Sequence, residues 1–351
     1  MTHSFSLKDI QGKLSHLRTT EGVARRRHPA EQDRDGWILT GNPFFADQHW
    51  KIGTSKALRR LGHKKQVFSQ TGNPHVRNRL THVHEVVKVA TMIASILGLN
   101  VELVAAIALG HDLGHTPFGH TGEEFITKVA GIPFRHEQFG VVIAQHIERS
   151  GIGLNLTWQT LQGILQHSRG ADELTECSFQ EATVVMYADK IAYTFADVND
   201  VERCFKPLDE LPEIQELLGW FGSNQDTRIR RCILALCNES GEKGTVSFKD
   251  SEEAINFAQL KELLYQQVYF ELEEMRNYER ACLHNAFEHL KRLVQGISPW
   301  VALALLTDDE VIQLARARRI HLPHIFPTLS VSEIIPHLKQ SIDYTNVDLD
   351  W

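Results

Sequence analysis

Residues 110–124 read GHDLGHTPFGHTGEE, which places three histidines and one aspartate within ten residues at the end of an apolar segment. Burying His111 and Asp112 beside Leu109 and Leu113 costs free energy unless a hydrogen bond or a cation compensates for it. Imidazole and carboxylate groups are common ligands of divalent metals. The stretch therefore indicates either a metal site or a hydrogen-bonded His–Asp pair in a hydrophobic core.

Two other segments favour the metal site. Residues 77–82 read RNRLTH and open an apolar helix well before His111 in the chain. On a third predicted helix, Asp189, Tyr193 and Asp197 are four residues apart and share one face. The residues that converge if these three helices pack together are His82, His111, Asp112 and Asp189. Two imidazoles and two carboxylates leave coordination positions open, which is typical of a catalytic metal site.

The composition is that of an ordinary globular chain. Of the 351 residues, 42% are hydrophobic and 23% are charged, which excludes disordered, collagen-like and disulfide-scaffold proteins. The formal net charge of −7 argues against a dedicated nucleic-acid binder, although the basic triplet at residues 25–27 leaves such contact open. We expect that triplet to lie on a solvated face of an extended N-terminal arm.

The cysteines and the apolar segments indicate a cytoplasmic protein without membrane contact. The five cysteines form no CxxC pair, which favours reduced thiols. The first residues lack the cationic and apolar pattern of a signal peptide. The longest apolar run, residues 103–109, is far shorter than a membrane span.

Helical periodicity dominates the chain, and the alternation typical of strands is almost absent. The predicted helices cover residues 78–97, 101–113, 121–130, 136–149, 158–167, 179–204, 210–219, 226–238, 253–295, 298–305, 308–318 and 331–341. Asn78 is a suitable N-cap, and Gly98 ends the same helix. We expect an all-α fold with an N-terminal arm over 1–50, a catalytic core over 51–210, and helices over 211–351 packed on the same domain.

Several segments between residues 44 and 205 form a recognisable set. These segments are Arg59–Leu61, Lys65–Phe68, Arg77–Val86, residues 111–124, His136–Gln138 and residues 189–197 (DKIAYTFAD). The set resembles the HD-domain phosphohydrolases and, within them, the deoxyguanosinetriphosphate triphosphohydrolase-like proteins. The resemblance implies an HD-domain helical bundle with additional C-terminal helices. The sequence departs from the family pattern at Lys65, where Thr is usual, and at Lys190, where many bacterial members have Asp.

The resemblance also implies the chemistry of the site. It makes His82, His111, Asp112 and Asp189 the ligands of a divalent cation, which is Mg²⁺, Mn²⁺, Fe²⁺ or another transition metal. It makes His120, with Glu123 as its partner, the general acid–base pair. It places His115 near the phosphates and His136 in the same hydrogen-bond network.

The implied substrate contacts are less firmly tied to the sequence. The resemblance makes Arg79 a phosphate clamp, lets Lys190 touch a phosphate, and gives Gln66 and Asp197 the 3′-hydroxyl of the sugar. It places Tyr193 under the sugar, where no room remains for a 2′-hydroxyl. Each contact has a plainer interpretation, because an Arg at a helix start, a core Tyr and a surface Gln are all ordinary.

The activity implied by the resemblance is hydrolysis of a deoxynucleoside triphosphate (dNTP) to deoxynucleoside and inorganic triphosphate. One alternative is another nucleotide phosphohydrolase on the same scaffold, such as a deoxynucleoside 5′-monophosphatase or a phosphodiesterase. A different alternative is a protein that senses nucleotides or binds single-stranded DNA. The expected partners are dNTPs, further copies of the chain in a homo-oligomer, and a nucleotide effector.

Overall fold

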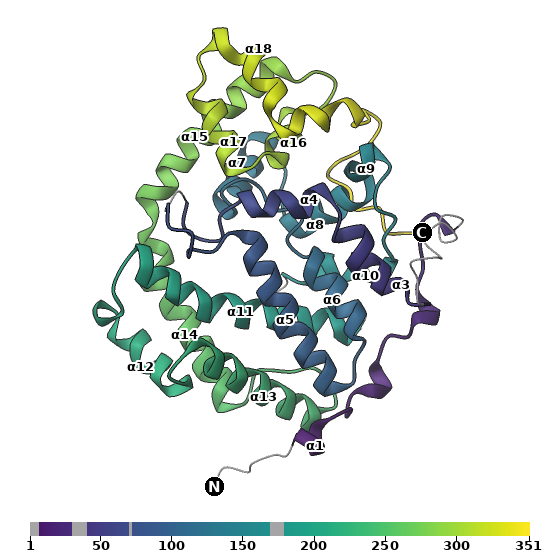
Figure 1. Cartoon of the computed structure of the whole chain (residues 1–351), viewed down its shortest axis with the longest axis vertical. Helices are drawn as coiled ribbons and strands as arrows, with labels where there is room; N and C mark the ends of the chain where they lie inside the picture. The colour runs from purple at the N-terminus through teal and green to yellow at the C-terminus, as the bar shows by residue number, and fades with distance from the viewer. Residues whose placement is uncertain (1–6, 30–40, 70–71, 169–178) are drawn as a thin grey trace.

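The computed structural model describes residues 7–29, 41–69, 72–168 and 179–351, and its regular structure is helical (Figure 1). Within these ranges there is no β-strand, and the only β-type contacts are two isolated bridges. The all-α expectation is confirmed. Cys177 lies outside the described ranges, and the other four cysteines are free thiols.

Three helices form the centre of the fold. They are α5 (Arg79–Leu97), α6 (Val101–Gly110) and α11 (Gln180–Cys204), and each packs against the other two. The side chain of Asn78 caps the first turn of α5, and Gly98 ends that helix with a φ of 80°. These short signals explain why the helix that carries His82 was predicted with nearly correct bounds.

Helix α5 is also the one helix within the described ranges that is long and apolar enough to cross a membrane. Nine of its residues are buried, and its neighbours α6 and α11 lie on the same hydrophobic cluster. A helix in the core of a globular domain is buried against its neighbours in this way. The length and composition of α5 are therefore explained by its place in the core.

Shorter helices surround this centre. They are α4 (Lys56–Arg60), α7 (His120–Ala130), α8 (His136–Val142), α9 (Glu148–Gly151) and α10 (Trp158–Gln166). Helix α10 packs on α6, α8 and α11, which brings it close to the start of α8. A π-helical turn continues α8 over Ile143–Ile147.

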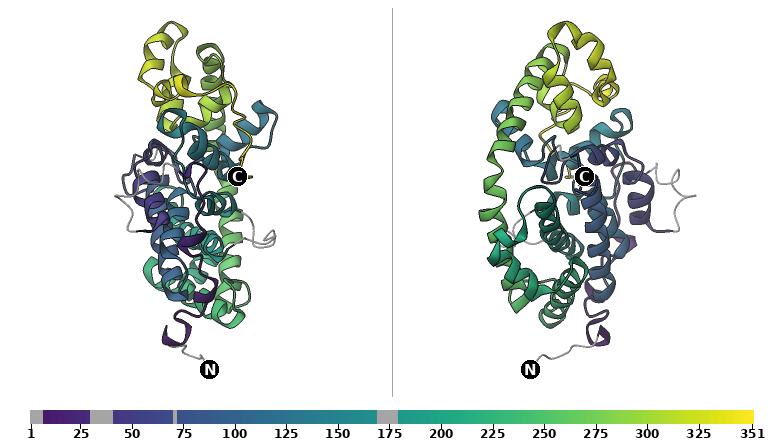
Figure 2. Two further views of the ribbon diagram at one scale, coloured as in Figure 1. Left: turned by 90° about the vertical axis from the view of Figure 1, so that its right-hand side faces the viewer. Right: turned by 60° about the vertical axis from the view of Figure 1, so that its left-hand side comes forward.

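The C-terminal part is helical as well. Its helices are α12 (Pro212–Phe221), α13 (Gln225–Lys243), α14 (Glu252–Gln267), α15 (Glu273–Leu293), α16 (Pro299–Leu305), α17 (Asp308–Arg316) and α18 (Leu322–Ile325). Figure 2 shows α15 running along the side of the molecule, where it joins α12–α14 to the group around α16 and α17.

Two of the predicted helices are wrong. The single helix predicted over 253–295 is broken between α14 and α15, where Val268 and Leu272 are buried and no Gly or Pro interrupts the sequence. Tertiary packing therefore overrides the local helical preference there. The helix predicted over 331–341 is a pair of 3₁₀ turns, because Pro336 has no N–H to donate and interrupts the ladder.

The N-terminal segment is made of short pieces: α1 (Leu7–Ile10), α3 (Pro43–Ala46) and a π-helical turn over Asp47–Ile52. Arg26 is buried and pairs with the buried Asp47 at 2.7 Å. The expectation that the basic triplet lies on a solvated face is therefore wrong for its middle residue, because a local charge run does not reveal a partner 21 residues away.

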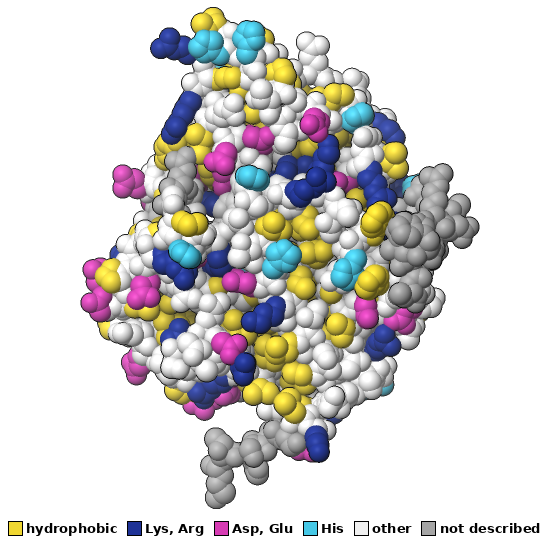
Figure 3. All heavy atoms as spheres, in the orientation of Figure 1, with side chains coloured by type: hydrophobic (Ala, Val, Ile, Leu, Met, Phe, Trp, Pro, Cys, Tyr) yellow, Lys and Arg dark blue, Asp and Glu magenta, His cyan; other side chains and the backbone are white. Residues whose placement is uncertain are grey.

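The buried hydrophobic residues form two clusters. One surrounds α5, α6, α11 and α12–α14, and the other joins α7, α8 and α10 to α15–α17. Val87 on α5 packs against both. On the face drawn in Figure 3, Lys and Arg side chains are interspersed with Asp and Glu, so no field of one sign covers that face. Residues of both groups of helices meet at the pocket described next.

Candidate active site

One pocket of about 400 Å³ opens where α5, α11 and the break between α14 and α15 come together. All of the predicted site residues line it except His111 and Glu123, which lie directly behind the lining residues. Residues that the sequence did not suggest also line it, among them His167, Lys261, Tyr265 and Tyr269. The fold therefore gathers residues between Lys65 and Arg276 in one place.

The residues predicted as metal ligands, here called the metal cluster, are His82, His111, Asp112 and Asp189. The Nε2 atom of His82 lies 3.0 Å from Oδ1 of Asp189, and Nε2 of His111 lies 3.4 Å from Oδ1 of Asp112. Nε2 of His111 is also 3.9 Å from Asp189. Ligand atoms about 2.1 Å from one cation lie roughly 3 to 4 Å apart, so the spacing fits a shared divalent ion.

The hydrogen bonding of His111 supports the same interpretation. Its Nδ1–H donates to the carbonyl of Ala108 at 2.7 Å, which leaves the lone pair of Nε2 free. That Nε2 atom is buried and has no hydrogen-bond partner. A buried acceptor without a donor is costly unless a cation fills the space before it. The chemistry of the donor set and this unpartnered atom both fit a divalent metal.

Electrostatics keep both carboxylates of the metal cluster ionised. Burial opposes the charge on Asp112, but His111, His115 and Arg79 outweigh it and hold its pKa well below the ordinary value. Burial likewise opposes the charge on Asp189, and the hydrogen bond from His82 holds its pKa low. Two anionic oxygens are thus available to a cation at any pH near neutrality.

A second group, here called the histidine cluster, consists of His115, His120, Glu123, His136 and His167. Glu123 stands at its centre, with Oε1 at 2.9 Å from Nδ1 of His136 and 3.1 Å from Nδ1 of His115. His120 is farther away at 3.6 Å, and its side chain is 78% exposed. The carboxylate implied as the partner of His120 thus pairs more closely with two other imidazoles.

The close approach of α8 brings His136 into this group. Gly114 follows the His-Asp pair, and a Cβ atom there would lie only 2.0 Å from the carbonyl oxygen of His136. Glycine is therefore required for this contact. As a result, the rings of His115 and His136 stack with centroids 3.8 Å apart.

The stacked imidazoles differ in charge. Burial opposes a charge on His136, but the adjacent Glu123 outweighs burial and raises its pKa to about 9. Burial lowers the pKa of His115 to about 4, and the positive charges of Arg79 and His136 act in the same direction. At neutral pH one ring is therefore a cation and the other is neutral.

His167 is a member of the histidine cluster that sequence reasoning missed. Its Nδ1–H donates to the carbonyl of Ile164 at 2.7 Å, so its Nε2 accepts from Nε2 of His136 at 3.2 Å. Its ring also packs edge-on against His111. The only signal in the sequence was a histidine at the end of a predicted helix, with no spacing that linked it to the other histidines.

Arg79 connects the metal cluster to the segment that carries Gln66. Its Nη1 donates to Oδ2 of Asp112 at 2.8 Å, and its Nη2 donates to the carbonyl of Gln66 at 3.4 Å. The buried Nε of Arg79 and the buried side-chain oxygen of Gln66 have no hydrogen-bond partner. Polar atoms left unpaired at the edge of a pocket are suited to contact a ligand.

The remaining side of the pocket, here called the tyrosine wall, consists of Tyr193, Tyr265 and Tyr269. The hydroxyl of Tyr269 donates to Oδ2 of Asp197 at 2.6 Å, and Tyr193 is hydrogen-bonded to Tyr265. Asp197 also pairs with Arg77, so its carboxylate is fixed from two sides. Tyr269 reaches this place because the chain breaks between α14 and α15.

Lys261 adds positive charge beside the wall. Burial lowers its pKa to about 8, and the nearby Lys190 contributes in the same direction. Lys190 and Lys261 thus line the same pocket as the metal cluster and the tyrosine wall. Their charges repel each other, and an anionic ligand would relieve that repulsion.

Comparison with known proteins agrees with this geometry. The HD-domain family profile matches residues 79–194, which include the whole metal cluster. A deoxyguanosinetriphosphate triphosphohydrolase-like protein of Caldanaerobacter subterraneus is 42% identical over 278 residues, covering 78% of this chain and 79% of the relative. Proteins of the same name from Clostridium tetani and Clostridium perfringens are 37% and 39% identical over 272 and 253 residues, covering 74% and 70% of this chain and 77% and 73% of those relatives. The chain therefore belongs to the deoxyguanosinetriphosphate triphosphohydrolase-like family of HD-domain proteins.

Proposed function

We propose that this protein is a metal-dependent dNTP triphosphohydrolase that releases a deoxynucleoside and inorganic triphosphate. Family membership makes it a hydrolase of phosphoric ester bonds. The observation that carries the finer proposal is the arrangement of one pocket. Residues of the metal cluster and of the histidine cluster, the lysines and the tyrosine wall all line this pocket, and Asp189 and Tyr193 are one helical turn apart on α11.

The metal cluster supports cleavage at the α-phosphate. When bound there, a divalent cation supplies Lewis-acid polarisation of a phosphoryl oxygen. The neighbours of Asp112 and Asp189 hold both carboxylates ionised, so both would offer an anionic oxygen to the cation. Arg79, which already contacts Asp112, offers its remaining N–H groups to the same phosphate.

The histidine cluster supports proton transfer to the leaving 5′-oxygen. His120 is the most exposed imidazole of the cluster, and it lines the pocket in which the nucleotide would bind. Glu123 restrains its ring from one side while holding His136 as a cation. We assign the general acid–base role to His120, and we assign His115 and His136 to fixing charge and orientation around the phosphate.

The other end of the pocket supports recognition of a deoxyribose. Tyr193 and Asp197 lie one helical turn apart on the lining face of α11, and Gln66 lines the same pocket. The hydrogen bonds of Tyr269 and Arg77 fix the carboxylate of Asp197, so a sugar 3′-hydroxyl meets a preformed acceptor. When a deoxyribose packs against the ring of Tyr193, no room remains for the additional 2′-hydroxyl of a ribonucleotide.

The proposal is tested by product analysis. The metal-free protein is reloaded with Mg²⁺, Mn²⁺ or Fe²⁺ and incubated with each dNTP and each NTP, and the products are separated by ion-exchange chromatography. Deoxynucleoside and intact triphosphate in equal amounts are the expected products. Monophosphate with pyrophosphate, orthophosphate alone, or equal turnover of NTPs would contradict the proposal.

We also propose that the chain assembles as a homo-oligomer and responds to a nucleotide effector, as its family resemblance implies. Light scattering with and without dNTPs gives the mass of the particle and tests the first statement. The rate of dNTP hydrolysis over a range of substrate concentrations, with and without a second dNTP, tests the second. A single-chain mass under all conditions contradicts the first. A rate that depends on substrate concentration without sigmoidal behaviour, and that no other dNTP changes, contradicts the second.

A further inference from the structure

The turn between α6 and α7 has an unusual backbone at the residue before Gly119. Phe118 has a φ of 58° although it has a side chain, and that side chain is fully buried. A non-glycine residue in this region costs free energy and persists only where its surroundings hold it. The turn carries His115 before it and His120 after it, so its shape sets the position of both imidazoles.

A carboxylate from the C-terminal part holds this turn. Asp308, the first residue of α17, accepts a hydrogen bond from the backbone N–H of Phe118 at 2.8 Å through Oδ1. Its Oδ2 accepts from the backbone N–H of Lys65 at 2.7 Å. One side chain therefore joins the turn to the segment that precedes Gln66.

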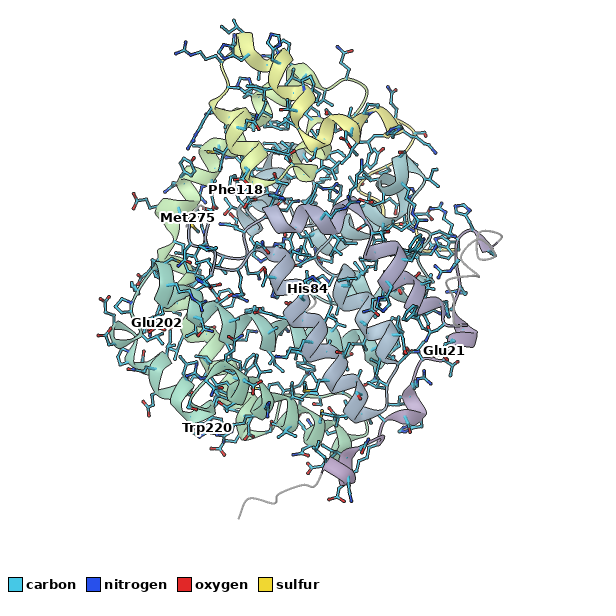
Figure 4. All side chains as sticks on the ribbon, in the orientation of Figure 1. Glu21, His84, Phe118, Glu202, Trp220 and Met275 are labelled. Atoms are coloured by element: carbon cyan, nitrogen blue, oxygen red, sulfur yellow. The ribbon has the colours of Figure 1, made fainter. Side chains whose placement is uncertain are left out.

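A second carboxylate repeats the arrangement from α15. The fully buried Glu279 accepts a hydrogen bond from the hydroxyl of Thr121 at 2.8 Å, and it pairs with the ammonium of Lys65. Lys64, also buried, donates to the carbonyl of His115 and to that of Ala304 in α16. Phe118 and Met275, both labelled in Figure 4, line the same pocket.

We propose that Asp308 and Glu279 are positioning residues, through which the C-terminal helices set the geometry of the catalytic turn. They act on the histidine cluster by way of Phe118 and Thr121, and on the Gln66 side of the pocket by way of Lys65. Neither touches the metal cluster in any recorded contact of the described residues.

The burial of these carboxylates supports a role beyond general stability. Taking an ionised carboxylate out of water is costly unless it is fully paired, and an apolar residue usually stabilises a junction better. Here each carboxylate is paired, and both bind the same two short segments. Because both carboxylates bind the turn at residues 118–121 and the segment at Lys65, together they fix the position of one segment relative to the other.

The test uses Asp308→Asn, which keeps one acceptor oxygen and removes the other. Asp309→Asn is the matched control, because it removes the same charge from the neighbouring exposed residue of the same helix. Hydrogen–deuterium exchange is measured on both variants. In Asp308→Asn, peptides covering 113–125 and 64–68 are expected to exchange about 10-fold faster, while those within 83–97 of α5 stay unchanged.

The activity readout rests on the proposed function, and exchange does not, so the two can fail separately. Asp308→Asn is expected to lower kcat about 10- to 100-fold, with KM within about 3-fold and bound metal unchanged. Should Asp308→Asn not fold, Glu279→Gln is judged by the same measurements. Unchanged exchange at the turn, or a loss of activity that only tracks the unfolded fraction, overturns the proposal. A wild-type protein without dNTP turnover contradicts the proposed function instead.

Discussion

The metal cluster and the tyrosine wall meet on one helix, α11, where Asp189 and Tyr193 are one turn apart, yet they are built differently. The metal cluster takes His82 from α5, Asp189 from α11, and His111 and Asp112 from the turn directly after α6. These three helices pack on one another, and hydrogen bonds and ion pairs fix the charges of the cluster. The tyrosine wall adds residues from α14 and from the break after it. Its polar contacts are few, and they end at Asp197.

This difference separates two kinds of effect. Changes in the metal cluster remove charge that the reaction needs, so they are expected to abolish turnover. Changes in the tyrosine wall alter how well a sugar is held, so they are expected to act on KM and on the choice between dNTPs and NTPs. The changes below range from the largest expected effect to the smallest.

The largest effect is expected from Asp189→Asn in the metal cluster. Partners that only orient a metal ligand already cost about 10- to 100-fold when removed, so loss of a ligand itself should cost about 1000-fold or more. Bound metal, measured by mass spectrometry, is expected to fall as well. Glu202→Gln on the exposed face of α11 is the control for the charge, and wild-type metal content is expected there.

His120→Ala is expected to lower kcat by about 10²- to 10⁴-fold, because it removes the imidazole assigned to proton transfer. Bound metal should be unchanged, since His120 belongs to the histidine cluster and not to the metal cluster. His84→Ala, on the exposed side of α5, is the matched control (Figure 4). Turnover of His120→Ala within 3-fold of wild type would mean that another group transfers the proton.

Tyr269→Phe in the tyrosine wall tests the other side of the comparison. The variant removes the hydroxyl that donates to Asp197 at 2.6 Å, and a hydrogen bond to a charged group contributes about 1.5 to 3 kcal/mol. We expect KM for dNTPs to rise about 10-fold while kcat changes little. Tyr278→Phe, on the exposed part of α15, controls for loss of a hydroxyl. A fall in kcat with unchanged KM would place the tyrosine wall in the chemistry.

The smallest effect is expected from Glu239→Gln, a buried carboxylate outside the pocket. Burial opposes its charge, but hydrogen bonds from Ser247, Lys249 and their neighbours outweigh it and lower its pKa to about 2. The variant should keep full activity and lose about 1 to 3 kcal/mol of unfolding free energy at pH 7.

The sign of the pH effect on Glu239 follows from that lowered pKa. The ordinary glutamate pKa is about 4.3, so the ionised group stabilises the fold fully above that pH and loses its contribution as pH falls toward 2. Urea unfolding of wild type and Glu239→Gln at pH 7 and near pH 3.5 measures this. The difference should shrink at the lower pH, and Glu242→Gln on the exposed side of α13 should show no difference at either.

The contrast between the metal cluster and the tyrosine wall also separates what the sequence predicts from what it does not. The ends of α5 and the all-α class follow from local signals, namely caps and periodicity. The proposed metal ligands follow from a short dense motif at His111 and Asp112, from the helices that carry His82 and Asp189, and from the resemblance to the HD-domain family. The place of Tyr269 in the pocket depends on the break between α14 and α15, and that of His167 depends on which helices pack together. No sequence signal near either residue indicates this. The buried Arg26 was mistaken for a surface residue for the same reason, since its partner Asp47 is not encoded nearby.

In the proposed reaction, water attacks the α-phosphorus of a dNTP and displaces the 5′-oxygen. The direct measurement is turnover of a dNTP in H₂¹⁸O by the metal-loaded protein, followed by mass spectrometry of both products. We expect inorganic triphosphate with one ¹⁸O and an unlabelled deoxynucleoside. Label in the deoxynucleoside, or products other than these two, would contradict it.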